Sequence, residues 1–115
     1  MATDVLQAVE VIEAMENFLE RRRPPEKIRH QVDLCYRIED QSVIIVELRS
    51  RLDKPDETIE IPVAKATFVK TENQWKVFWQ RADLKWHSYS PKPTVKNIRD
   101  FVKLVDEDKQ GCFWG

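Results

Sequence analysis

Residues 31–90 alternate between apolar and polar side chains with a period of two, and this alternation restricts the fold more than any other feature. Val32, Leu34, Tyr36 and Ile38 alternate with polar neighbours, and a similar pattern returns after residue 43. Successive side chains of a β-strand point to opposite faces, so the period predicts strands. The connections between these runs are too short for a crossover helix. The sheet is therefore predicted to be antiparallel.

Runs of β-branched and aromatic residues give the positions of the strands. Two strands are expected within residues 31–50, joined at residues 39–41. After a polar connection that contains proline come residues 64–70, 75–81 and 84–89, with a short additional piece at residues 59–61. Consecutive strands of this kind predict a meander of about five strands.

Apolar residues recur at helical spacing on both sides of the strand region. The stripe predicted for a helix over residues 4–22 is Val5, Ala8, Val9, Ile12, Met15 and Leu19. Pro24 and Pro25 end this helix. A second helix is expected to be capped by Thr94 and to end before Asp106. Its stripe is Val95, Ile98, Phe101, Val102 and Val105.

These elements predict one α+β domain over residues 1–115, with an N-terminal helix, an antiparallel meander and a C-terminal helix. A chain of 115 residues is long enough to bury a core of its own. Both helices are expected on one side of the sheet. The aromatic residues near the C-terminus, Phe113 and Trp114, are expected to dock on the body.

Several kinds of site are excluded by composition. Both glycines lie in the last five residues, so the chain has no glycine-rich phosphate loop. His30 and His87 are far apart, and Cys35 and Cys112 show no metal-ligand spacing and are expected as reduced thiols. No cofactor is expected. The longest apolar run, residues 43–46, is far below the ~18 residues of a membrane span, and the start shows no signal sequence, so we expect a cytoplasmic protein.

Charge is distributed unevenly along the chain, although the net charge is only −1. Residues 1–20 contain five acidic residues and no Lys or Arg, whereas residues 21–92 contain 15 Lys or Arg and 11 Asp or Glu. The mildly basic middle segment is compatible with an anionic partner such as nucleic acid.

Strand register then predicts a basic, aromatic sheet face. If residues 72–73 and residues 82–83 form two-residue turns, one face is a core of Ala64, Ala66, Phe68, Val77, Trp79, Leu84 and Trp86. The other face carries Lys65, Thr67, Val69, Lys76, Phe78, Gln80, Lys85, His87 and Tyr89. Such a face is either the ordinary outer side of a sheet or a platform on which rings stack on bases and lysines meet phosphates.

Two charged groups near this face admit two interpretations each. The run Arg21, Arg22 and Arg23 either complements the dipole at the end of the first helix or extends the binding patch. Asp83 either shapes a turn and pairs with Arg81, or forms an acid–base group with Lys85 and His87. The candidate binding surface is Arg21, Arg22, Arg23, Lys65, Lys76, Phe78, Lys85, His87 and Tyr89.

A pair of carboxylates is expected in the first hairpin. A three-residue loop there places Leu34 opposite Val46 and Asp33 opposite Glu47, and two opposed carboxylates need a cation between them. Arg37, Arg49 or Lys65 supplies that cation in a surface cluster. Alternatively, a divalent metal ion binds between the two carboxylates. The arrangement then faintly resembles the Asp…Glu-x-Lys motif of metal-dependent nucleases, with Asp33, Glu47, Arg49 and Lys65 as its members.

The chain also resembles a known bacterial family over nearly its whole length, from about residue 18 to residue 115. The matching strings are Arg-Arg-Arg-Pro-Pro at 21–25, Tyr-Arg-Ile-Glu at 36–39, Pro-Val-Ala-Lys at 62–65, Asp-Leu-Lys-Trp-His at 83–87, Val-Asp-Glu-Asp at 105–108 and Gly-Cys-Phe at 111–113. They resemble the family catalogued as domain of unknown function 3024. The family pattern has glycine where this chain has Asp40. The resemblance implies no activity, cofactor or catalytic residue.

Three functions remain open from the sequence. The first is a non-enzymatic binding module whose basic, aromatic face takes an anionic partner such as nucleic acid. The second is a metal-dependent nuclease or phosphodiesterase that uses Asp33 and Glu47. The third is a structural homodimer or complex subunit, because four tryptophans in a short chain suit an interface.

Overall fold

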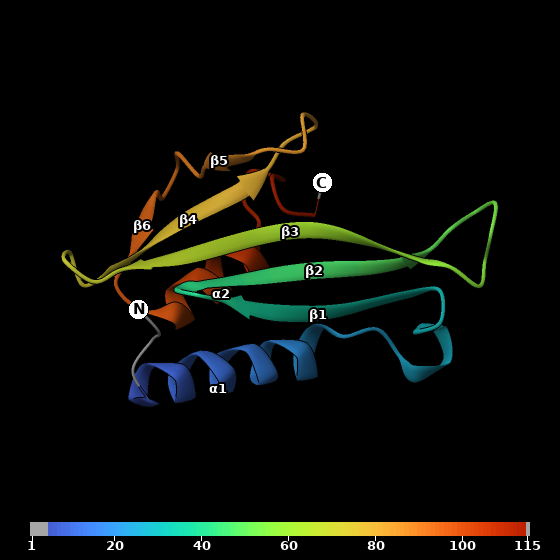
Figure 1. Ribbon diagram of the computed structural model, residues 1–115, viewed down its shortest axis with the longest axis horizontal. Helices are drawn as coiled ribbons and strands as arrows, with labels where there is room; N and C mark the ends of the chain where they lie inside the picture. Colours follow the sequence, from blue (N-terminus) through green and yellow to red (C-terminus); the bar gives the residue numbers. More distant parts are fainter. Residues whose placement is uncertain (1–4, 115) are drawn as a thin grey trace.

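The computed structural model describes residues 5–114, and side chains from residue 7 onward. Its elements in chain order are α1 (Val5–Arg22), the short 3₁₀ helix η1 (Glu26–Ile28), β1 (Val32–Glu39), β2 (Ser42–Ser50), β3 (Thr58–Val69), β4 (Gln74–Gln80), β5 (Trp86–Ser88), β6 (Thr94–Val95) and α2 (Ile98–Glu107). The predicted order of helix, antiparallel meander and helix is confirmed (Figure 1).

All strand pairs are antiparallel, and β1 to β5 follow one another across the sheet. The small strand β6 pairs with β4 on the same side as β5, which makes a sixth strand that the sequence did not predict. Thr94 lies in β6, so it does not cap α2 as predicted. Asn97 is the N-cap, and its side chain accepts a hydrogen bond from the backbone N–H of Asp100.

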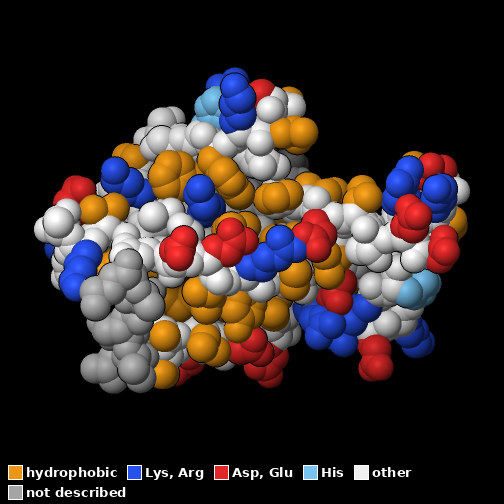
Figure 2. Space-filling view, in the orientation of Figure 1, with side chains coloured by type: hydrophobic (Ala, Val, Ile, Leu, Met, Phe, Trp, Pro, Cys, Tyr) orange, Lys and Arg blue, Asp and Glu red, His pale blue; other side chains and the backbone are white. Residues whose placement is uncertain are grey.

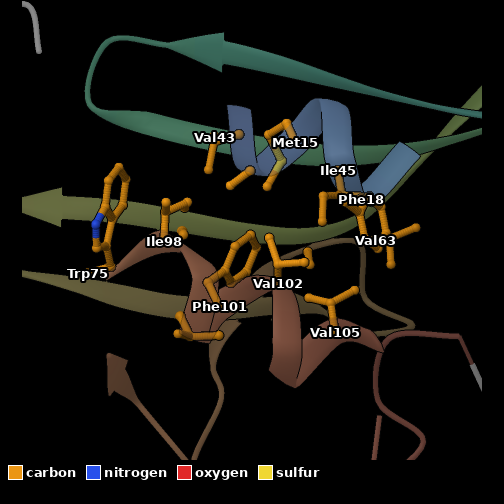
Figure 3. Close-up of a cluster of buried hydrophobic side chains, with 14 of the residues drawn as sticks. Met15, Phe18, Val43, Ile45, Val63, Trp75, Ile98, Phe101, Val102 and Val105 are labelled. Carbon is orange, nitrogen blue, oxygen red and sulfur yellow. The ribbon is translucent and has the colours of Figure 1, made fainter. Parts of the chain in front are cut away.

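One hydrophobic core lies between the sheet and the two helices, which confirms that both helices cover the same face. Figure 3 shows side chains of α1, α2 and the sheet pointing toward one another. The fully buried members include Met15 and Phe18 from α1, Val43, Ile45 and Val77 from the sheet, and Phe101 and Val105 from α2. Burial of this apolar surface is the main favourable term in the stability of the fold.

The buried stripe of α1 differs from the predicted one. Val9 and Ile12 are 54% and 45% exposed, whereas Val11, Ala14 and Phe18 are buried. The helix is turned so that the large ring of Phe18 enters the core, where it stacks on Trp114 with the centroids 6.5 Å apart. Apolar residues cover a broad part of the surface of α1, so the sequence alone did not decide which side of the helix faces the core.

The C-terminal tail docks on the body as predicted. The backbone N–H groups of Phe113 and Trp114 donate to the two carboxylate oxygens of Asp108 at 3.0 and 2.9 Å. The indole Nε1 of Trp114 donates to the carbonyl of Val105 at 2.9 Å. Helix α2 continues to Glu107, past the predicted end before Asp106, because Asp106 pairs with Arg21 and Arg22 and Asp108 caps the tail.

Candidate functional site

The face of the sheet opposite the helices is the candidate site, and we call it the outer face. Antiparallel partners share a face, and the pairs Lys65 with Phe78, Thr67 with Lys76 and Gln80 with Trp86 place these side chains there. Figure 2 shows Lys and Arg side chains among hydrophobic ones over β3 and β4. No helix of the described residues covers this face (Figure 1).

Lys65 occupies the centre of an aromatic pair on the outer face. Its Nζ lies 5.1 Å from the ring centroid of Phe78 and 5.1 Å from that of Trp86. Both distances fall within the range of cation–π attraction. Among the described residues, Lys65 has no carboxylate partner, so its ammonium is available to an anion that comes to this face. The outer face therefore presents two half-buried rings with a cation between them.

Trp86 was predicted in the core, and its place on the outer face follows from the turn before β5. The predicted two-residue turn at residues 82–83 is wrong. The N–H of Arg81 donates to the carbonyl of Lys85, which leaves a loop of three residues, and Leu84 takes a left-handed φ of 63°. One extra loop residue moves every side chain of the following strand to the other face. A glycine at the left-handed position is the usual signal for such a loop, and this chain has leucine there.

The same shift removes Tyr89 and His87 from the predicted binding surface. Tyr89 is 2% exposed and its ring lies 4.9 Å from that of Phe113, and burial raises the pKa of the Tyr89 hydroxyl. Tyr89 is thus a core residue. His87 pairs in register with Trp79 on the side of the sheet that faces the helices.

Of the two partners that the sequence offered for Asp83, the structure pairs it with His87, and no ion pair with Arg81 forms among the described residues. The Asp83 carboxylate accepts from the backbone N–H of Lys85 at 3.0 Å and lies 2.9 Å from Nε2 of His87, and these contacts hold the pKa of Asp83 below its usual value. The guanidinium of Arg81 lies over the Trp79 ring, 5.6 Å from its centroid. Lys85 is exposed in the turn before β5, in register with Arg81 and not with the outer-face pair of Gln80 and Trp86.

The three arginines at the end of α1 are engaged within the chain. Arg21 pairs with Asp106 at 2.6 Å, and Arg22 lies 4.8 Å from the centroid of Trp114 and 3.6 Å from Asp106. Arg23 donates twice to Asp33, at 2.8 Å each. These contacts tie α1 to α2, to the tail and to β1, a role that neither interpretation of the run from the sequence included.

The expected pair of Asp33 and Glu47 does not form. The first hairpin turns through two residues, with Asp40 at a φ of 53°, and not through the predicted three. Asp33 is therefore opposite Leu48, and Glu47 is opposite Leu34 and points to the other face. Glu47 pairs with Arg49 instead. The two carboxylates cannot share one metal ion, and no three His, Cys, Asp or Glu side chains among residues 5–114 form a metal-binding group.

The Arg23–Asp33 ion pair makes the free energy of unfolding depend on pH. The hydrogen bonds from Arg23 lower the pKa of Asp33. The ionised carboxylate is favoured more in the folded chain than in the unfolded one, so this stabilisation is present above the unfolded pKa and lost as pH falls through the lowered folded pKa. Between pH 7 and about pH 2, the urea midpoint of the wild type is expected to fall further than that of Asp33→Asn. Equal falls in both proteins would contradict this role.

The two cysteines show no feature of reactive thiols. Cys35 and Cys112 are free and half-buried. Burial raises the pKa of both, which disfavours the nucleophilic thiolate at neutral pH.

Comparison with known proteins identifies a family and nothing more specific. No curated protein and no solved structure matches the chain. No helix in the described part of the chain is long and apolar enough to cross a membrane. A family model described as "Domain of unknown function (DUF3024)" matches residues 3–115. Because this match covers essentially the whole chain, the protein belongs to the DUF3024 family.

Proposed function

We propose that the protein is a non-enzymatic binding module whose outer face takes single-stranded nucleic acid. The observation that carries this proposal is the position of Lys65 between the rings of Phe78 and Trp86 on a face that the helices leave open. Lys76 lies on the same face. Lys85 is exposed in the turn before β5. Tyr89, His87 and the three arginines are not part of this site.

The chemistry of this cluster suits an unpaired base next to a phosphate. Aromatic rings stack on bases at a gain of about 1–3 kcal/mol per base, whatever the base is. Lys65 has a flexible stem, so its ammonium can leave the ring faces for a phosphate oxygen while a base takes its place on the rings. Bases within a duplex are already stacked on their neighbours, so this site favours a single strand.

The charge of the protein sets the expected salt dependence. The chain as a whole has a net charge of −1. Among the described residues, the outer face offers Lys65 and Lys76, because its Arg37 is paired with Glu60, and Lys85 is exposed in the turn before β5. Neutralising two or three phosphates gives a slope of log K against log salt of roughly −1.4 to −2.1 for a single strand. Affinity is therefore expected to depend more on stacking than on charge.

The test is binding of a labelled single-stranded oligonucleotide, with a duplex of the same sequence for comparison. Lys65→Ala is expected to weaken single-strand binding and to reduce the salt slope by about 0.7. Lys109→Ala is the matched control, because Lys109 is an exposed lysine outside the outer face. Equal binding of the duplex, or equal effects of the two variants, would contradict the proposal.

A further inference from the structure

The lysines and rings of the outer face are confined to one side of the sheet. Residues 64–69 of β3, together with β4 and β5, contain no Asp or Glu. Their outer side chains include Lys65, Lys76, Phe78 and Trp86. We call this part of the outer face the basic half. A nucleic acid that lies on it meets two cations and two rings, and no carboxylate from these strand segments.

The rest of the outer face is acidic. By strand register, Asp33 and Glu39 of β1 and Glu60 of β3 lie there, and Arg37 is the cation among them. Glu39 is exposed and has no ion-pair partner among the residues that the structure describes. The other two carboxylates pair with Arg23 and Arg37. Figure 2 shows Asp and Glu side chains between the basic half and α1. Like charges repel, so this acidic half disfavours the phosphates of a nucleic acid.

The two lysines and the two rings of the basic half are close neighbours. Register makes Lys65 and Lys76 diagonal neighbours across β3 and β4, at about 7–8 Å between Cα atoms. It makes Phe78 and Trp86 diagonal neighbours across β4 and β5 in the same way. Both rings lie 5.1 Å from the ammonium of Lys65. The cluster therefore offers one ring to each of two bases and one ammonium to each of two phosphates.

We infer that the site takes two consecutive nucleotides, and that the bound nucleic acid runs along β4 over the basic half. One base stacks on Phe78, the next stacks on Trp86, and Lys65 and Lys76 each meet one phosphate. Nucleotides beyond these two find no further ring on the outer face of the described residues. The smallest ligand that fills the site is a dinucleotide with a 5′-phosphate. This inference rests on the proposed function and adds to it the length and the path of the bound segment.

A length series of 5′-phosphorylated oligothymidylates, from one to eight nucleotides, tests the footprint. The Nε1–H resonance of Trp86 reports binding at each length. The dinucleotide is expected to bind about 10-fold to 100-fold more tightly than the mononucleotide, because it adds one stacked base. Beyond two nucleotides, affinity is expected to rise only in proportion to the number of overlapping dinucleotides in the oligonucleotide.

Reversal of one charge tests the path. Glu39→Lys puts a cation in place of an exposed carboxylate of the acidic half. The octanucleotide is then expected to bind more tightly, with a salt slope steeper by about 0.7, whereas the dinucleotide does not reach this half and is expected to bind as it does to the wild type. Glu10→Lys is the matched control, because it makes the same change in net charge at an exposed position on α1. It is expected to change neither affinity at physiological salt, where distant charges are screened.

Three results would overturn the inference and leave the proposed function standing. The first is a dinucleotide that binds no more tightly than the mononucleotide. The second is an affinity that keeps rising about tenfold for each nucleotide beyond two, since more than two bases would then be stacked. The third is equal tightening of the dinucleotide and the octanucleotide by Glu39→Lys. If no length shifts the Trp86 resonance, the proposed function fails, and this inference fails with it.

Discussion

Trp86→Ala is expected to weaken binding of a single-stranded oligonucleotide by about 10-fold to 100-fold, the loss that corresponds to one stacked base. The indole of Trp86 lies on the outer face beside Lys65, 5.1 Å from its ammonium. Its removal takes away a stacking surface and one of the two rings that hold the cation. Affinity is measured by fluorescence anisotropy of the labelled strand, with the free energy of unfolding measured in parallel.

Two further variants separate stacking from a general effect of losing an indole. Trp86→Phe keeps an aromatic face and is expected to retain most of the affinity. Trp114→Ala removes a half-buried indole that packs on Phe18 and Arg22 at the tail, so it should lower stability and leave binding unchanged. Wild-type affinity in a folded Trp86→Ala protein would rule out the outer face as the site.

Tyr89→Ala is expected to lower the free energy of unfolding by about 3–5 kcal/mol, as for other buried aromatic side chains. Tyr89 is 2% exposed and packs on Phe113, so the substitution leaves a cavity in the core under the tail. Urea unfolding monitored by circular dichroism measures the change.

Tyr89→Phe is the control for that cavity, since it keeps the ring and removes only the hydroxyl. It is expected to be close to the wild type in stability and in oligonucleotide binding. If Tyr89→Ala instead kept wild-type stability and lost binding, Tyr89 would be an exposed stacking residue, and the observed face of β5 would be wrong.

The elements of the fold were predictable because they depend on local periodicity. The period of two in residues 31–90 placed the strands, and the stripe from Ile98 to Val105 placed the buried face of α2. The prolines at 24 and 25 ended α1 near the observed Arg22. These signals are repeated over many residues, so an error at one position does not remove them.

The composition of the outer face was only partly predictable, because it depends on the length of each turn. The loop between β3 and β4 has four residues and not the predicted two. Because side chains alternate between faces, a difference of two loop residues leaves Lys65, Lys76 and Phe78 on the predicted face. The loops of the other two hairpins differ from the predicted length by one residue. In the hairpin of β4 and β5, this difference brings Trp86 to the outer face and takes His87 and Tyr89 away from it. In the first hairpin, it separates Asp33 from Glu47.

Left-handed residues other than glycine explain why those two turns were misjudged. Asp40 and Leu84 have positive φ values of 53° and 63°. Glycine is the usual residue at such positions, and the chain has none between residues 1 and 110. The family resemblance, in which glycine is expected where this chain has Asp40, left the type of this hairpin loop open.

The central claim is that the outer face binds a single strand, and the indole resonances of the four tryptophans test it most directly. In ¹H–¹⁵N spectra recorded during titration with a single-stranded oligonucleotide, the Nε1–H signal of Trp86 is expected to shift. The signal of Trp75, which is 4% exposed in the core, and that of Trp114, which donates to Val105, are expected to stay in place. Shifts at Trp114 without a shift at Trp86, or no shift at any indole, would contradict the account.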